Sequence, residues 1–182
     1  TKGHLYDKMK TLGDSITYIG GHPMAGSERF RYNASKEHLF ENAYYIIAPG
    51  ENVPEEKTAE FKETVTKIGA IPVIISPYEH DYAVASISHV PHIIAAALVN
   101  NVKKLDSDKE YMHLLAAGGF KDITRIASSS ADMWESITFE NKEDIISVLD
   151  SFSEVINDIR SNIMNNNTDY VYNYFLNAQQ YR

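Results

Sequence analysis

The sequence predicts an α/β fold over residues 1–76 and an all-helical fold over residues 77–182. The first observation is that short β-branched and aromatic runs, bounded by glycine and proline, dominate the part before Ser76. The second is that apolar residues after Ser76 recur at spacings of three and four, the period of an amphipathic helix. No internal repeat or low-complexity linker intervenes, so we expect a domain boundary near residues 76–80. With 43% apolar residues, the chain has enough apolar surface for one or two real cores.

Three runs in the α/β portion are typical of strands: residues 16–19, 44–48 and 71–76. Pro72 stands near the start of the third run, where a missing amide is tolerated on an edge strand. A helix is predicted over residues 54–68, because its apolar residues fall on one stripe. A strand, a helix and a strand in this order indicate a crossover unit in a partly parallel sheet.

Five helices are predicted in the second portion. They cover residues 77–100, 107–117 and 131–137, a segment that follows an Asn141 cap, and a segment that starts at a Thr168 cap. Pro91 cannot donate to the carbonyl of Ile87, so we expect the first helix to be interrupted there. The fourth helix is the clearest, with an apolar stripe from Ile145 to Ile163 that indicates a core or a subunit interface.

Composition excludes several classes of function. The formal net charge is −8, with acidic residues spread along the chain, so no basic stripe exists to neutralise nucleic-acid phosphates. The chain has no cysteine, which excludes a disulfide framework, a thiol nucleophile and a thiolate metal site. The longest strongly apolar runs, such as residues 93–99, are too short to span a bilayer, and the N-terminus lacks a signal-peptide pattern. We therefore expect a cytoplasmic protein with neither nucleic acid nor membrane as a partner. Since no methionine starts the chain, we also expect a segment of a longer protein.

The first candidate site is the glycine-rich segment that contains His22. It follows a predicted strand, which places His22 at a strand's carboxyl end, where open α/β sheets bind ligands. Histidine there can act as a general base near neutral pH, and Glu28 could orient it or tune its pKa. The alternative is a glycine-rich turn with an incidental histidine, and the motif alone does not choose between the two.

The second candidate site is the first predicted helix, where three of the seven histidines lie between residues 80 and 92. Ser88 and His92 are one helical turn apart, and His89 is also a neighbour of His92. A helix interrupted by proline and lined with serine and histidine suits a polar ligand. Two alternatives stay open. The His80–Asp81 pair could ligate a metal in a helical hydrolase, or these histidines could only satisfy hydrogen bonds in a core.

The third candidate site contains two cations four residues apart, Lys121 and Arg125, with Asp122 between them. Arg125 could bind a carboxylate through two parallel hydrogen bonds, which suits a small anionic substrate. The alternative is a surface arginine on a new helix. Trp134, the single tryptophan, is interpreted as a packing residue.

Taken together, these segments resemble the prephenate dehydrogenase family in order and spacing, over nearly the whole chain. They are Gly20-Gly21-His22-Pro23-Met24-Ala25-Gly26, His80-Asp81 with Ser88-His89-Val90-Pro91-His92, and Gly119-Phe120-Lys121-Asp122-Ile123-Thr124-Arg125-Ile126-Ala127 with Met133-Trp134. Thr1-Lys2-Gly3 also looks like the end of the family's Gly-Ser-x-Lys-Gly segment, so the family's catalytic serine would precede Thr1.

The resemblance implies that residues 1–76 are the back part of a Rossmann-type NAD(P)-binding domain and that residues 77–182 are a helical domain that dimerises two subunits. It implies oxidative decarboxylation of prephenate to 4-hydroxyphenylpyruvate in tyrosine biosynthesis, with NAD as the cofactor and NADP not excluded. The sequence contains no Gly-x-Gly-x-x-Gly, so the pyrophosphate-binding turn would lie upstream and the segment alone would be nearly inactive. No metal is implied, because the nicotinamide carries the redox chemistry.

The resemblance also implies roles for single residues. His22 would be the catalytic base, and Arg125, His92 and Ser88 would bind the substrate. Glu28 and Asp122 would orient His22 and Arg125 or gate the pocket, whereas His80, His89 and Lys121 would be mainly structural. An arogenate or dual-specificity cyclohexadienyl dehydrogenase is the near alternative, and a metal-dependent hydrolase on the histidine-rich helix is the distant one.

Overall fold

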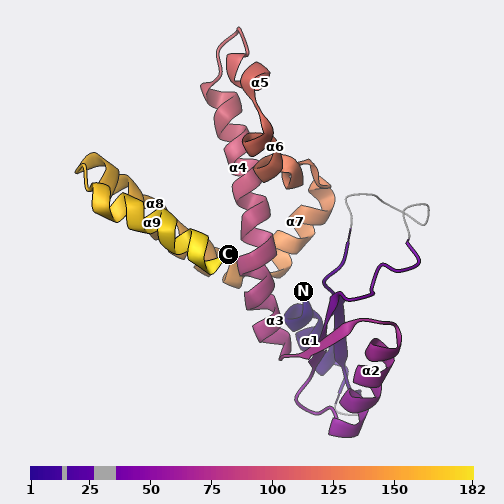
Figure 1. The fold of residues 1–182 in the computed structure, drawn as a ribbon. Helices are drawn as coiled ribbons and strands as arrows, with labels where there is room; N and C mark the ends of the chain where they lie inside the picture. Colours follow the sequence, from indigo (N-terminus) through magenta and orange to yellow (C-terminus); the bar gives the residue numbers. More distant parts are fainter. Residues whose placement is uncertain (14–15, 27–35) are drawn as a thin grey trace.

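The computed structural model describes residues 1–13, 16–26 and 36–182, and it has the two parts that the sequence predicts (Figure 1). A three-stranded sheet lies in the N-terminal part, and helices make up the rest. The prediction of an α/β portion followed by an all-helical portion is therefore confirmed. Glu28, one of the predicted site residues, lies outside the described residues.

The sheet consists of β1 (Ile19–Pro23), β2 (Tyr44–Pro49) and β3 (Ile71–Ile74), in that spatial order. β2 and β3 pair in parallel, and α2 (Glu55–Lys67) connects them as the predicted crossover unit. β1 pairs antiparallel with β2, so the sheet is mixed. Pro72 lies on β3, which is an edge strand of this three-stranded sheet, as its missing amide requires.

The observed strand β1 starts at Ile19, the last residue of the predicted strand. The prediction covered residues 16–19, whereas the strand starts at Ile19 and continues through both glycines of the first motif. Pairing with β2 overrides the low strand propensity of glycine. A Cβ atom on Gly21 would come within 2.7 Å of the Tyr45 hydroxyl, so glycine leaves room for that side chain. His22 therefore lies inside the strand, one residue before its end, and not in a turn after it.

A small core lies where α2 packs against β2 and β3. Its buried residues are Ile47, Val65 and Ala70, with Ile19, Phe40, Tyr45 and Phe61 packed around them.

A helix that the sequence did not predict, α1 (Lys2–Lys10), precedes the sheet. It packs against α3 (Pro77–Val84), and its buried Tyr6 accepts a hydrogen bond from the amide of Glu51 at 2.9 Å. The N-terminus of α1 therefore faces α3, which positions the backbone amides used in the site described below.

The long helix of the second part begins at a capping box. The Ser76 side chain accepts from the amide of Glu79, whose side chain accepts from the amide of Ser76. α3 is continuous with α4 (Val90–Leu105) through a π-helical turn, Ala85–His89. The predicted interruption therefore lies just before Pro91. A proline lacks the amide that would close the α-helical bond to residue 87, and the wider turn accommodates this.

This continuous helix, Pro77–Leu105, is longer than the apolar runs of the sequence indicated. Over its 29 residues it has a mean hydropathy of 1.6 in its most apolar window, so by length and composition alone it could cross a membrane. The sequence analysis predicted that the longest apolar runs are too short to span a bilayer. For this helix, that prediction about length was wrong. Core helices of soluble proteins meet the same two criteria, and this helix carries the buried His80 and Asp81.

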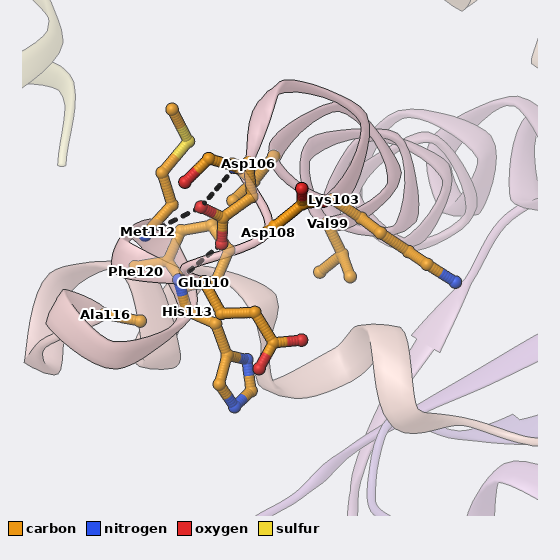
Figure 2. A pocket seen from close by; sticks show the side chains of 11 residues that line it. Val99, Lys103, Asp106, Asp108, Glu110, Met112, His113, Ala116 and Phe120 are labelled. Carbon is orange, nitrogen blue, oxygen red and sulfur yellow. Dashed lines mark hydrogen bonds between the residues drawn. The ribbon is translucent and has the colours of Figure 1, made fainter.

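The segment after α4 is less helical than predicted. Within the predicted helix 107–117, only α5 (Tyr111–Leu115) forms. The carboxylate of Asp106 accepts hydrogen bonds from the backbone amides of Ser107, Met112 and His113, at 3.0–3.1 Å (Figure 2). These bonds hold the intervening residues in a loop, since the amides that would continue a helix already have a partner.

The remaining helices are α6 (Gly118–Thr124), a 3₁₀ turn (Arg125–Ser128), α7 (Ala131–Glu140), α8 (Lys142–Met164) and α9 (Thr168–Tyr181). The cap of α9 is Asn167, whose side chain accepts from the amide of Tyr170, and not the predicted Thr168. α8 begins after Asn141 as predicted, but the Asn141 side chain makes no capping bond.

A second core joins the long helix to the start of α8. Its buried residues are Ala85, Val90 and Ile145, with Ile93, Ile94, Val148 and Leu149 packed around them. Beyond this core, α8 and α9 form a hairpin that projects away from the rest of the chain (Figure 1). The stripe predicted on α8 is therefore covered at Ile145 but uncovered at Ile156 and Ile163.

Candidate active site

A row of three side chains connects the sheet to the long helix. Nδ1 of His22, on β1, lies 2.7 Å from Nε2 of His80 on α3. Nδ1 of His80 in turn lies 2.6 Å from a carboxylate oxygen of Asp81. His80 and Asp81 are only 2% and 4% exposed, so the bond between them is shielded from water, whereas the bond to the half-buried His22 is partly buried. The structure thus brings together residues that are 58 positions apart in sequence.

The chemistry of the carboxylate fixes the direction of the hydrogen bonds in this row. Burial raises the pKa of the Asp81 carboxyl, but hydrogen bonds from His80 and from the amides of Lys2 and Gly3 outweigh that effect and lower it. Asp81 is therefore ionised and accepts the Nδ1 proton of His80. When His80 carries a single proton, on the Nδ1 that faces Asp81, its Nε2 accepts the Nδ1 proton of His22. This leaves the lone pair of His22 on Nε2.

His22 is neutral at physiological pH. Burial lowers the pKa of its imidazole to about 4, and the neighbouring His80 and Lys2 add to the shift. No described residue donates a hydrogen bond to Nε2 of His22. The half-buried ring therefore presents an unprotonated nitrogen that can take a proton from a bound group.

Asp81 is the junction between the two parts of the chain. Its two carboxylate oxygens accept the backbone amides of Lys2 and Gly3, at 2.7 and 2.8 Å, from the first turn of α1. A carboxylate at a helix N-terminus is stabilised by the unpaired amides and by the helix dipole. Gly3 is required at this contact, because a Cβ atom there would come within 3.0 Å of the Asp81 carboxylate.

Asn141 completes this buried network from α8. Its side-chain amide donates to the carbonyl oxygen of Asp81 at 2.9 Å and to Nδ1 of His89 at 3.1 Å. His89 is 7% exposed, and burial lowers the pKa of its imidazole to about 4, so it is a neutral acceptor. The sequence interpretation of Asn141 as a helix cap missed this role, because nothing in the local pattern marks a side chain that reaches another helix.

A second cluster lies one turn further along the long helix, around His92. Nδ1 of His92 donates to the carbonyl of Ser88 at 2.8 Å. The ring stacks on Trp134 of α7, with centroids 3.8 Å apart. His92 and Trp134 line a cavity of about 230 Å³, together with Ile126 and Ser129. The Nε1 donor of Trp134 is buried and has no hydrogen-bond partner among the described residues.

The third predicted segment lies beside this cavity. Arg125 is exposed at the start of the 3₁₀ turn that follows α6, directly before the cavity residues Ile126 and Ala127. Asp122 and Lys121 are exposed on α6. The structure thus places Arg125 near the His92 cluster in the helical part, whereas His22 belongs to the sheet.

The structure shows a contact of His80 that the sequence interpretation did not include. His80 and His89 were interpreted as mainly structural, but His80 bonds directly to His22. Both ring nitrogens of His80 are occupied, by His22 and Asp81, so His80 has no lone pair for a metal. Across the described ranges, no group of three or more histidine, aspartate or glutamate side chains could hold a metal ion. The geometry therefore gives no support to the metal-dependent hydrolase.

A cavity larger than the one beside His92 lies elsewhere in the described part. About 640 Å³ in volume, it is enclosed by the far end of α4, α5 and the loop around Asp106 (Figure 2). None of the predicted site residues lines it, so it is not where the sequence motifs meet.

Comparisons with known proteins agree with this arrangement. Residues 1–74 match the family model described as "Prephenate dehydrogenase, nucleotide-binding domain", and residues 76–177 match "Prephenate dehydrogenase, dimerization domain". The chain belongs to the prephenate dehydrogenase family. The two matched ranges meet at the end of the sheet, at the residues that begin the long helix.

The chain is also similar in sequence to three curated relatives. The chain is 41% identical to prephenate dehydrogenase of Bacillus subtilis over 95% of its own length and 47% of the relative's. It is 32% identical to the Lactococcus lactis enzyme of the same name, over 100% of the chain and 50% of the relative. It is 30% identical to a cyclohexadienyl dehydrogenase of Zymomonas mobilis, over 96% of the chain and 61% of the relative. The chain thus spans about half the length of the first two relatives.

One solved structure shows the same fold. The chain superposes on prephenate dehydrogenase from A. aeolicus with a TM-score of 0.87 at 30% identity, over 96% of the chain and 60% of that protein. That structure is a complex with hydroxyphenyl propionate and NAD+.

The described residues fit only part of an NAD site. They include the strand and half-buried histidine that could face a redox ring, but no glycine-rich turn from a strand into a helix that could hold the diphosphate.

Proposed function

We propose that the protein to which this chain belongs oxidatively decarboxylates prephenate to 4-hydroxyphenylpyruvate in tyrosine biosynthesis. The observation that carries the proposal is the neutral His22, whose Nδ1 is held by His80 and whose Nε2 lone pair is open among the described residues. Membership of the prephenate dehydrogenase family supports the substrate class. When bound, NAD supplies the hydride acceptor, and NADP is the alternative carrier.

The reaction needs a base because the substrate loses a hydroxyl proton. As hydride leaves the ring carbon that bears the hydroxyl, Nε2 of His22 accepts the proton of that hydroxyl. The ring carboxylate then leaves as carbon dioxide, and the ring becomes aromatic, which drives the reaction forward. A neutral histidine suits this step, since a protonated one could not accept.

Prephenate is a dianion, so its binding requires donors and positive charge. We assign Arg125 to one substrate carboxylate, because a guanidinium can donate two parallel hydrogen bonds to it. We also assign His92 and Ser88, on the long helix, to substrate binding. His92 lines the same cavity as Trp134, whose indole donor is buried without a partner among the described residues. In this assignment Asp122 and Glu28 orient Arg125 and His22.

We also propose the organisation of the whole enzyme. Residues 1–76 are part of an NAD-binding domain, and residues 77–182 form a helical domain through which two subunits associate. The dimer proposal is supported by the family model's name and by the exposed apolar side chains on the α8–α9 hairpin, which include Ile156, Ile163 and Phe175. We further propose a cytoplasmic enzyme without nucleic-acid or membrane partners.

The proposal is tested by the substrate dependence of NAD reduction. Purified full-length protein is assayed with prephenate, with arogenate, and with neither. We expect the largest kcat/KM with prephenate. A strong preference for arogenate would favour the arogenate or cyclohexadienyl alternative, which the similarity to the Zymomonas mobilis relative keeps in view. Absence of turnover with both substrates would refute the proposal.

A further inference from the structure

We propose that His80 and Asp81 are positioning residues that hold His22 in its reactive tautomer and receive the proton that it takes from the substrate. This inference rests on the proposed function of His22 as the base. It is carried by the geometry of the row: His22 Nδ1 to His80 Nε2 at 2.7 Å, and His80 Nδ1 to Asp81 at 2.6 Å.

The first part of the inference is the control of the tautomer. An isolated neutral histidine exchanges its proton between two nitrogens, and only the form with a bare Nε2 can act as base here. The Asp81 carboxylate accepts but cannot donate, so His80 must place its proton on Nδ1 and its lone pair on Nε2. His22 must then place its proton on Nδ1, so its lone pair lies on Nε2. The tautomer of His22 is therefore set by the negative charge of Asp81, which acts through His80.

The second part is the destination of the proton. When Nε2 of His22 binds the substrate proton, the Nδ1 proton of His22 passes to Nε2 of His80. One proton enters the row and none leaves, so His22 becomes neutral with its proton on Nε2, and His80 becomes an imidazolium. The positive charge then lies against the Asp81 carboxylate. A buried pair of this kind is stable only if each charge has further hydrogen bonds. Asp81 has them, from the amides of Lys2 and Gly3.

The surroundings favour this role over a purely structural one. His22 binds a proton poorly, because burial lowers its pKa to about 4, so a base that retained the proton would be inefficient at neutral pH. The other groups that face the row are the Lys2 side chain, Tyr18, His89, Asn141 and Asp144. Among the described residues, Asp81 forms a hydrogen bond with His80 of the row, whereas Asp144 forms none with its histidines.

The test uses two variants of the full-length protein with different expected defects. In Asp81→Asn the neutral amide no longer dictates the proton position on His80, so His22 loses its fixed tautomer. In His80→Gln the amide oxygen still accepts from Nδ1 of His22, but it cannot take up the proton. We expect kcat to fall in both, on the order of tenfold to a hundredfold, a fraction of the gain that acid–base catalysis gives. KM should stay nearly constant.

Two readouts separate this role from a structural one. Nitrogen-15 spectra of the histidines should show His22 with a protonated Nδ1 in the wild type and in His80→Gln, but with mixed tautomers in Asp81→Asn. We would measure kcat in mixtures of light and heavy water. In the wild type, where two protons move, kcat should fall along a curve as the deuterium fraction rises. In His80→Gln, where one proton moves, it should fall along a straight line. Asp7→Asn is the matched control, since Asp7 is exposed on α1 and its bonds among the described residues are to Lys10 and Tyr78.

The outcomes distinguish the two proposals. If the wild type oxidises prephenate but both variants keep their kcat, the relay is refuted while the proposed function stands. If Asp81→Asn loses activity but His22 keeps its tautomer, Asp81 only anchors α1, and the inference is again refuted. If the wild type shows no prephenate-dependent NAD reduction, the proposed function fails, and the nitrogen-15 spectra still decide whether Asp81 orders the row.

Discussion

The junction between the sheet and the long helix and the α8–α9 hairpin are built in opposite ways. At the junction, polar groups are buried and bonded to one another, through His22, His80, Asp81 and Asn141. On the hairpin, apolar groups are exposed, with Ile156 at 44% and Phe175 at 66%. The first arrangement is complete within one chain, whereas the second leaves an apolar surface without cover. Chemistry and association are therefore assigned to separate regions, and mutations should separate them too.

The largest effect is expected at His22. In the full-length enzyme His22→Asn keeps a side-chain donor near His80 but removes the base, so kcat should fall by a factor on the order of 10² to 10⁴. Steady-state kinetics with prephenate measure it, and KM should stay nearly constant. His38→Asn is the control, because His38 is exposed and pairs with Glu41 away from the row. Equal activity of the two variants would remove His22 from the mechanism.

Two isoleucines on α8 test the contrast directly. Ile145 is 2% exposed in the core beside Ala85, so Ile145→Ala should lower the free energy of unfolding by about 2–5 kcal/mol. Ile156, eleven positions later, is 44% exposed, so Ile156→Ala should change the free energy of unfolding of a separated protomer by no more than about 0.5 kcal/mol.

The second variant should instead weaken self-association. Burying an isoleucine contributes about 1.5–3 kcal/mol per protomer, so sedimentation should show a dimer dissociation constant raised by roughly tenfold or more. Denaturant unfolding and sedimentation of both variants complete the comparison. A dimer unaffected by Ile156→Ala would place the interface elsewhere.

Arg125 should affect binding more than turnover. Arg125→Ala removes a charge-assisted contact to a substrate carboxylate, which contributes about 1.5–3 kcal/mol, so KM should rise roughly tenfold to 150-fold. Substrate titrations give KM and kcat separately. Arg160→Ala, at an exposed position on α8, should behave like the wild type. A fall in kcat without a change in KM would contradict the assignment to substrate binding.

The buried histidines of the junction should also make the stability depend on pH. His22 and His89 have folded-state pKa values of about 4, below the value of about 6.5 in an unfolded chain. Their contribution to stability is complete above pH 6.5 and is lost as the pH falls towards 4, because the unfolded chain binds the protons first. The loss approaches about 1.4 kcal/mol per pH unit for each histidine. Asp81 adds to it at lower pH, through its own lowered pKa.

Urea unfolding across this pH range measures the slope. His89→Asn keeps a side-chain acceptor for Asn141 but removes one of the two histidines that titrate. The change in unfolding free energy per pH unit should therefore fall by the contribution of one histidine. An unchanged slope in this variant would mean that His89 does not titrate as described.

Local patterns predicted the layout because local forces determine it. The capping box at Ser76, the crossover helix between β2 and β3, and the start of α8 all follow from neighbouring residues. β1 was misplaced by three residues, since its limits depend on pairing with β2 rather than on propensity. α1 was missed because its packing against α3, and not its own sequence pattern, accounts for its position.

For the candidate site, the sequence indicated single residues but not the contacts between them. His22, Ser88, His92 and Arg125 stood out through their motifs, and their roles remain predictions. The link from His22 to His80 could not be predicted, because the two lie 58 residues apart and meet only when the sheet packs on α3. The adjacency of His80 and Asp81 was the one available signal, and it suggested a metal ligand pair equally well.

The π-helical turn Ala85–His89 determines how the two ends of the long helix are phased. A turn of this kind contains one residue more than an α-helical turn. Each α-helical residue rotates the chain by about 100°. The wider turn takes up this extra residue within about the rotation of four α-helical residues, so deleting one residue of the turn would leave an unbroken α-helix with His80 and His92 facing nearly their present directions. Deleting a second residue would rotate the two histidines by about 100° relative to each other, so this segment tolerates the loss of one residue but not of two.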